Sequence, residues 1–156
     1  MSRIEQRLIE LGSPLPEVAK PVAAYAPFAV SGNLVFTAGQ LPFVNGVLPT
    51  TGKVGEGAGL VDPATAKSLA RQAALNALAA VKLAIGDLDR VTRIVKVVGF
   101  VASVPEFSGQ PGVINGSSEF LVEVFGDAGV HARSAVGVSV LPLDSAVEVE
   151  LIVEFA

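Results

Sequence analysis

Two runs of alternating apolar and polar residues occupy the last 26 positions of the chain. The second run, 147–155, places apolar side chains on one face and carboxylates, Glu148 among them, on the other. The first run, 133–140, alternates valines with small residues and Arg133. A period of two predicts strands with one buried face. If the two strands pair as a hairpin with their valines in one core, Arg133 and Glu148 share the opposite face.

The strongest helical pattern begins at Asp62-Pro63 and ends at Gly86. An aspartate cap followed by proline favours a helix start, and glycine favours a helix end. The alanine-rich segment has a broad apolar face, which predicts packing flat against a sheet. A second helix is predicted at about 113–125, and a short amphipathic helix at 2–11.

Other patterns predict further strands and turns. The run 91–104 is rich in β-branched residues and predicts a long strand, and 34–37 predicts a short one. Asn45-Gly46 stands between two apolar pairs and predicts a tight hairpin turn. The segment 22–30 is mixed in pattern, and its proline indicates a strand edge or a break.

The order of these elements predicts an α+β fold, with one mixed β-sheet and two main helices packed on one face. A chain of 156 residues is most simply one domain. Residues 1–19 then form an N-terminal helix and linker that extend this single domain.

Composition narrows the possible functions. Charged residues make up 17% of the chain, against about 25% in an average protein, which hints at subunit contacts. The formal net charge is −4, and no basic cluster is present to meet the phosphates of a nucleic acid. The absence of cysteine excludes disulfides, thiolate metal sites and cysteine nucleophiles. Without a signal core or a long apolar stretch, a cytoplasmic protein that does not enter a membrane is expected.

Arg133 and Glu148 are the candidates for chemistry. A guanidinium grips a carboxylate with two parallel hydrogen bonds, and Arg133 is flanked by small residues that leave room. The alternative, which spacing alone favours, is an ion pair with Glu148 or Glu150 or a solvated side chain. Glu148 would position or deprotonate a water molecule, and its alternative is a solvated carboxylate on a polar strand face.

Two further polar residues are assigned structural roles. Asn115 stands near the start of the second predicted helix, where capping that helix is favoured over donating its amide to a ligand. His131 is the only histidine, and it is predicted to be a loop or strand-edge residue without a catalytic role. No nucleophile-elbow glycines surround a serine, and no helix carries metal-ligand spacing.

These stretches resemble a known family. The segment from Phe36 to Pro42 resembles a family stretch in which a strand ends in Ser/Ala-Gly-Gln-Ile/Leu-Pro. The closing segment Ala132-Arg133-Ser134, followed by Leu141-Pro142 and Val147-Glu148-Val149-Glu150, resembles the family's closing signature, and Asp62-Pro63, Gln72 and Asn76 also match. The family is the YjgF-like or Rid (reactive intermediate deaminase) family, also named "endoribonuclease L-PSP". The likeness covers residues 20–156.

The resemblance implies a chorismate-mutase-like fold and a homotrimer that encloses a central barrel, with ligand sites in clefts between subunits. The family's arginine, which binds a substrate carboxylate, falls on Arg133. Its water-positioning glutamate falls on Glu148, its asparagine falls on Asn115, and the backbone near Gly39 would line the cleft.

The sequence departs from the family pattern at three positions. Phe28 stands where well-studied deaminases have tyrosine, Ala38 stands in place of serine, and Ala135 replaces a cysteine. Phe28 and Ala135 would therefore give the substrate site apolar walls. The departures keep the anion clamp and remove hydrogen-bonding groups.

The resemblance implies hydrolysis of reactive enamine/imine intermediates, of the 2-iminobutanoate/2-iminopropanoate type, to 2-oxo acids and ammonia. Neither a metal nor an organic cofactor is implied. The alternative is a non-catalytic binding protein for small carboxylate metabolites that uses the same cleft. The ribonuclease activity in the family's older name is disfavoured by the acidic pI of 4.9 and the single histidine.

Overall fold

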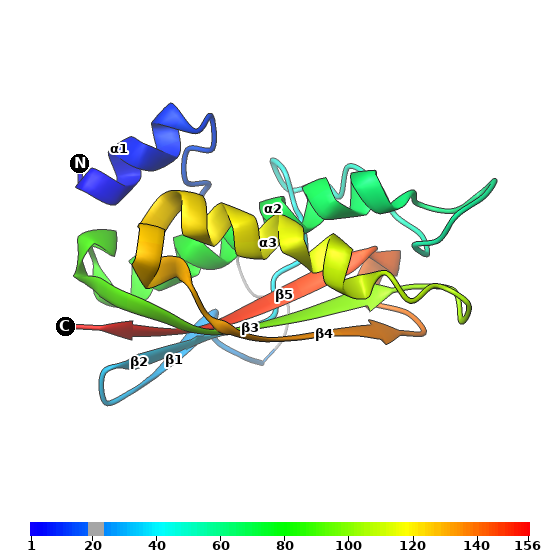
Figure 1. Ribbon diagram of the computed structural model, residues 1–156. Coiled ribbons are helices and arrows are strands. Elements are labelled where there is room, and N and C mark those ends of the chain that lie inside the picture. The colour runs from blue at the N-terminus through cyan, green and yellow to red at the C-terminus, as the bar shows by residue number, and fades with distance from the viewer. Residues whose placement is uncertain (19–23) are drawn as a thin grey trace.

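Five strands form one sheet in the order β1-β2-β5-β3-β4 in the computed structural model, which describes residues 1–18 and 24–156. The strands are β1 (Phe28–Ser31), β2 (Leu34–Thr37), β3 (Val91–Ala102), β4 (Ala132–Val138) and β5 (Val147–Phe155). Neighbouring strands are antiparallel except β3 and β4, which are parallel. The helices α2 (Pro63–Ile85) and α3 (Gln110–Phe125) lie on one face of this sheet (Figure 1). The predicted α+β fold with a mixed sheet is confirmed.

The long helix α2 has the predicted boundaries. The Asp62 carboxylate accepts a hydrogen bond from the backbone N–H of Thr65, and Pro63 occupies the first turn. Gly86 ends the helix with a φ of 83°, a conformation that other residues rarely adopt. Helix α3 begins at Gln110, three residues before its predicted start. Its proline lies in the first turn, where a missing N–H costs no hydrogen bond.

The short N-terminal helix α1 (Arg3–Glu10) is attached to the rest of the domain by polar contacts. The Asp89 carboxylate accepts hydrogen bonds from the backbone N–H groups of Arg3 and Ile4, at 2.9 and 2.8 Å. Glu5 pairs with the Lys82 ammonium of α2, and this hydrogen bond lowers the pKa of Glu5 to about 2. The predicted N-terminal helix is therefore confirmed, and it docks beside the helical layer.

The predicted hairpin of the last two strands is wrong. β4 pairs with β3 in parallel, after a crossover through α3, and β5 lies between β2 and β3. β3 therefore separates β4 from β5. The chain between them is not a tight hairpin turn but passes through the short 3-10 helix η3 (Pro142–Asp144), in which Leu143 has a φ of 58°.

The faces of β4 are also opposite to the predicted ones. Register with β3 places Gly137 and Arg133 on the face that meets the helices, whereas Val136 lies on the outer face. The reason is the close approach of α3. A Cβ at Gly99 of β3 would lie 2.5 Å from the Ile114 side chain, and one at Gly137 would lie 2.8 Å from a side-chain nitrogen of α3. Small residues are therefore needed on the inner face, and valines lie outside.

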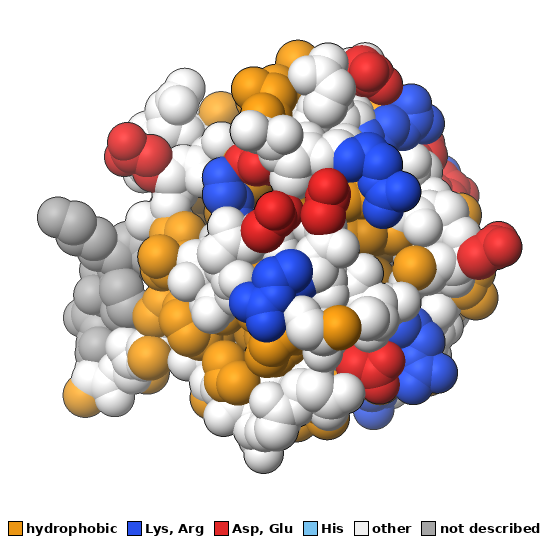
Figure 2. Space-filling model, turned by 90° about the vertical axis from the view of Figure 1, so that its left-hand side faces the viewer, with side chains coloured by type: hydrophobic (Ala, Val, Ile, Leu, Met, Phe, Trp, Pro, Cys, Tyr) orange, Lys and Arg blue, Asp and Glu red, His pale blue; other side chains and the backbone are white. Residues whose placement is uncertain are grey.

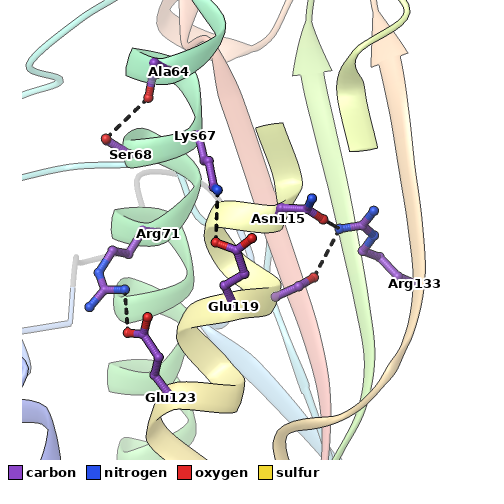
Figure 3. A network of polar contacts seen from close by, with 9 residues as sticks. Ala64, Lys67, Ser68, Arg71, Asn115, Glu119, Glu123 and Arg133 are labelled. Atoms are coloured by element: carbon purple, nitrogen blue, oxygen red, sulfur yellow. Dashed lines mark hydrogen bonds and ion pairs between the residues drawn. The ribbon is translucent and has the colours of Figure 1, made fainter. Parts of the chain in front are cut away.

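Helix α3 is fixed against α2 by close packing and ion pairs. A Cβ at Gly116 would lie 2.9 Å from the carbonyl carbon of Lys67, so only glycine permits this approach. Lys67 pairs with Glu119 at 2.9 Å, and Arg71 pairs with Glu123 at the same distance (Figure 3). These contacts set the position of the α3 residues that face β4.

Two predictions concern the first third of the chain. The Asn45-Gly46 turn is confirmed, with φ values of 50° and 79° and a bridge between Val44 and Val47. The mixed segment 22–30 contains β1, which begins at Phe28 and forms an edge of the sheet. Residues 19–23, which include the end of the predicted linker, lie outside the described part.

Candidate functional site

Arg133 lies at the centre of a polar cluster between β4 and α3. Its Nη1 donates hydrogen bonds to Asn115 Oδ1 at 2.7 Å and to Ser118 Oγ at 3.2 Å. The Ser118 hydroxyl is also 2.8 Å from Nε2 of His131. Figure 3 shows Arg133 extending from β4 toward Asn115 on α3. We call Arg133, Asn115, Ser118 and His131 the Arg133 cluster.

The cluster corrects two expectations. Asn115 does not cap α3, because the helix begins at Gln110 after Gly109, and the Asn115 side chain accepts from Arg133 instead. The expected ion pair of Arg133 with Glu148 or Glu150 is also wrong, because β3 lies between their strands.

Sequence reasoning missed Ser118. Its signal was the spacing of three from Asn115, which places both side chains on one face of a helix.

Glu148 lies in a different place, in a cavity of about 740 Å³. The cavity also contains Tyr25, Gly39, Gln40 and Phe43 in its wall. We call these five residues the Glu148 pocket. Its size falls within the range of small-molecule sites, about 300–1,000 Å³.

The environment of Glu148 favours its neutral form. Burial raises the pKa of its carboxyl group above the ordinary value, and the negative charge of Glu150 adds to this effect. Among the described residues no hydrogen bond lowers that pKa again. A Cβ at Gly39 would lie 2.8 Å from the carboxyl carbon of Glu148 and closer still to its Oε1. Only glycine at position 39 leaves the carboxyl group its present place.

One of the aromatic residues in the pocket wall is a residue that the sequence did not single out. Phe28 packs against the hydrophobic core and does not line this pocket. Tyr25, the only tyrosine of the chain, does line it, three positions earlier. Ala135 also packs against the core, on the same face of β4 as Arg133.

The structure thus divides the predicted site residues into two groups. Arg133, Asn115 and Ala135 lie on the helix side of the sheet, whereas Glu148 lies on the outer side beside Gly39. Arg133 and Leu151 both pair with Val97 of β3, so they lie two strand spacings apart. Glu148 lies three residues along β5 from Leu151. These offsets place the two Cα atoms about 14 Å apart, with the side chains on opposite faces. One chain therefore does not bring the guanidinium and the carboxylate to one small substrate.

Within 1–18 and 24–156, no three histidine, aspartate or glutamate side chains gather as a metal site would require. No helix in the same ranges combines the length and apolar character needed to cross a membrane.

A family model described as "YjgF/chorismate_mutase-like, putative endoribonuclease" matches residues 5–155 of this chain. The match therefore includes both the Arg133 cluster and the Glu148 pocket.

Solved structures agree with this match. A protein from Agrobacterium tumefaciens, known from a crystal structure, is 47% identical in sequence to this chain. The two match with a TM-score of 0.89 over 98% of this chain and 92% of that chain. A "putative endoribonuclease" from Shewanella oneidensis MR-1 is 34% identical, with a TM-score of 0.92 over 99% and 100% of the two chains. TdcF of E. coli, crystallised with bound serine, is 26% identical, with a TM-score of 0.62 over 91% and 94%.

Proposed function

Because this chain belongs to the YjgF/chorismate mutase-like family, whose fold it has, we propose that it hydrolyses reactive enamine/imine intermediates to 2-oxo acids and ammonia. The observation that carries the proposal is the division of the site between two faces of one sheet. A guanidinium and a carboxylate so placed act on one small substrate only when they come from different copies of the chain. The proposed site is therefore a cleft between subunits of a homotrimer.

The outer face of the sheet supports such an assembly. Opposite the helices, Phe36 and Val136 are exposed and Phe100 and Ile152 are half-buried, in neighbouring rows of the sheet. An exposed apolar face of this kind is typical of a subunit contact. β4 is an edge strand, so its end with Arg133 is accessible to a second copy that covers the outer face of its neighbour.

Arg133 binds the carboxylate of the substrate in this proposal. Its Nη1 is held by Asn115 and Ser118, and the rest of its guanidinium faces the cleft with a fixed orientation. A bidentate grip on the carboxylate then fixes the direction of the neighbouring imine carbon.

Glu148 of the other copy activates the water. Its carboxylate takes a proton from water as the oxygen attacks the imine carbon, and it passes that proton to the nitrogen, which gives a carbinolamine. The hydroxyl proton of the carbinolamine then moves through the same carboxylate to the nitrogen as the C=O bond forms, so the nitrogen leaves as ammonia. One water is consumed, the C–N bond breaks, and the product is a 2-oxo acid. A raised pKa suits this role, because a carboxylate of raised pKa is a stronger base.

The direct test is to generate the imine from threonine or serine with a pyridoxal-dependent dehydratase and to follow the 2-oxo acid. We expect the assembled protein to accelerate its formation over spontaneous hydrolysis. Glu154→Gln changes a carboxylate on the same strand face and serves as the matched control. No acceleration by an assembled protein would contradict the proposal.

The second candidate is a non-catalytic binder of small carboxylates in the same cleft. It is favoured by the absence of polar side chains at Ala38 and Ala135, and the serine in TdcF supports a carboxylate ligand. Binding of 2-oxobutanoate that is lost in Arg133→Ala, without turnover by the native protein, would select the binder.

The charges on the surface do not favour cleavage of RNA. At the end of the molecule that carries both termini, Lys and Arg alternate with Asp and Glu rather than forming a basic stripe (Figure 2). Arg93 and Glu154 form one such pair there. A phosphate backbone normally binds to a continuous positive surface.

A further inference from the structure

His131 lies directly before β4, and both of its ring nitrogens have partners. Nδ1 is 2.6 Å from the carbonyl oxygen of Gly129, and Nε2 is 2.8 Å from Ser118 Oγ. A carbonyl oxygen only accepts, so Nδ1 carries the proton. In the neutral ring Nε2 is then an acceptor, and the Ser118 hydroxyl donates to it.

This hydrogen bond fixes the direction of the Ser118 hydroxyl hydrogen and therefore also the direction of the oxygen's lone pairs. With its hydrogen directed at His131, the Ser118 oxygen offers its lone pairs to Nη1 of Arg133, 3.2 Å away. Asn115, one helical turn earlier, accepts from the same nitrogen at 2.7 Å. Both hydrogens of Nη1 are therefore used.

The consequence is a defined free edge on the guanidinium. In the part of the chain that the structure describes, no hydrogen bond involves Nε or Nη2 of Arg133. These two nitrogens form one of the edges that bind a carboxylate with two parallel hydrogen bonds. Fixing Nη1 therefore fixes the direction of the edge that remains for a ligand.

We propose that His131 is a positioning residue for Arg133, and that it acts through the hydroxyl of Ser118 to keep the Nε–Nη2 edge directed at the ligand carboxylate. The proposal rests on the assignment of Arg133 as the carboxylate clamp, in an enzyme or in a binder. It gives His131 a role that the sequence did not indicate, without contact between His131 and the substrate.

Two substitutions separate this role from a structural one. In His131→Asn the amide nitrogen takes the place of Nδ1 and keeps the bond to Gly129, but Ser118 loses its acceptor. In His131→Gln the amide oxygen takes the place of Nε2 and keeps that acceptor, but the Gly129 contact is lost. A role confined to holding the loop requires the first contact, whereas positioning Arg133 requires the second.

The measurement is calorimetry with 2-oxobutanoate on the assembled protein, with Ser68→Ala as a control for a serine on the other helix. We expect His131→Asn and Ser118→Ala to weaken binding about fivefold to tenfold, as the loss of one hydrogen bond predicts. His131→Gln should stay within about twofold of the native affinity. In the imine assay KM should rise and kcat should change little.

A double-mutant cycle completes the test. Because both residues act along one path, adding His131→Asn to Ser118→Ala should weaken 2-oxobutanoate binding by less than about a further twofold. Full additivity, or a larger loss in His131→Gln than in His131→Asn, would overturn the positioning role. If Arg133→Ala lowers the affinity while no His131 variant does, the positioning role fails and the proposed clamp stands. If Arg133→Ala leaves binding unchanged, both fail.

Discussion

The Arg133 cluster and the Glu148 pocket lie on opposite faces of one sheet and hold their charged groups in opposite ways. The guanidinium is half-buried and meets two acceptors on α3. The carboxyl group is also half-buried, but its surroundings raise its pKa through burial and a second negative charge. The different partners of two half-buried groups thus produce a fixed cation in one place and a group ready to exchange a proton in the other.

This difference assigns separate tasks to the two regions. The Arg133 cluster, whose guanidinium is fixed by hydrogen bonds, is suited to hold a ligand. The Glu148 pocket, whose carboxyl group has a raised pKa, is suited to react with that ligand. Substitutions in the Glu148 pocket should therefore lower turnover, whereas substitutions in the Arg133 cluster should lower affinity.

Glu148→Gln should have the largest effect. It removes the proposed base and leaves the shape of the pocket, so kcat in the imine assay should fall about 10²- to 10⁴-fold. Calorimetry with 2-oxobutanoate should show little change in affinity, because the clamp is on another copy. An equal loss of affinity would contradict the division of tasks.

Arg133→Ala should weaken 2-oxobutanoate binding about 10- to 100-fold, through the loss of hydrogen bonds to a charged ligand. Arg133→Lys keeps the charge but not the planar fork, and it should fall between the native protein and the alanine variant. The measurement is the same calorimetry, with thermal unfolding to show that each variant is folded. If kcat falls at unchanged affinity, Arg133 belongs to the reaction rather than to binding.

Gly39→Ala should reduce kcat by about tenfold, since the added Cβ displaces the Glu148 carboxyl group from its position. Gly112→Ala is the matched control, because nothing lies within 4 Å of a Cβ there. Steady-state kinetics of both variants would check this, and an effect on KM alone would argue against displacement of Glu148.

The pH dependence of kcat/KM should show the smallest effect. Activity requires the ionised Glu148, so it is lost as the pH falls through the pKa of that group. Because this pKa is raised, the loss should occur at a higher pH than for an ordinary glutamate. Glu150→Gln removes one cause of the raised pKa and should move the loss to lower pH. If the pH profile of kcat/KM is the same in Glu150→Gln, the loss of activity at low pH belongs to a group other than Glu148.

Local signals predicted much of the fold. The aspartate and proline at 62–63 and Gly86 set both ends of α2, and the Asn45-Gly46 turn formed as its sequence indicates. Strand partners were not predictable in this way, because alternation is the same whichever strand lies alongside. The valines of β4 suggested a core face, yet the close approach of α3 requires Gly137 there and turns the valines outward.

The sequence selected residue types for a candidate site but did not predict their arrangement. The family signature selected Arg133 and Glu148, but only the register of both strands with β3 places them on opposite faces. Tyr25 was missed because Phe28 matched the family's aromatic position, although Tyr25 is the one that lines the pocket.

The most direct test of a site shared between copies is to mix two inactive variants. Arg133→Ala still supplies Glu148, and Glu148→Gln still supplies Arg133. When the two are unfolded together in equal amounts and reassembled, about a quarter of the clefts should contain both native residues and recover activity. A site within one chain would give no recovery in hybrids that affinity tags show to be mixed, and that result would contradict the account.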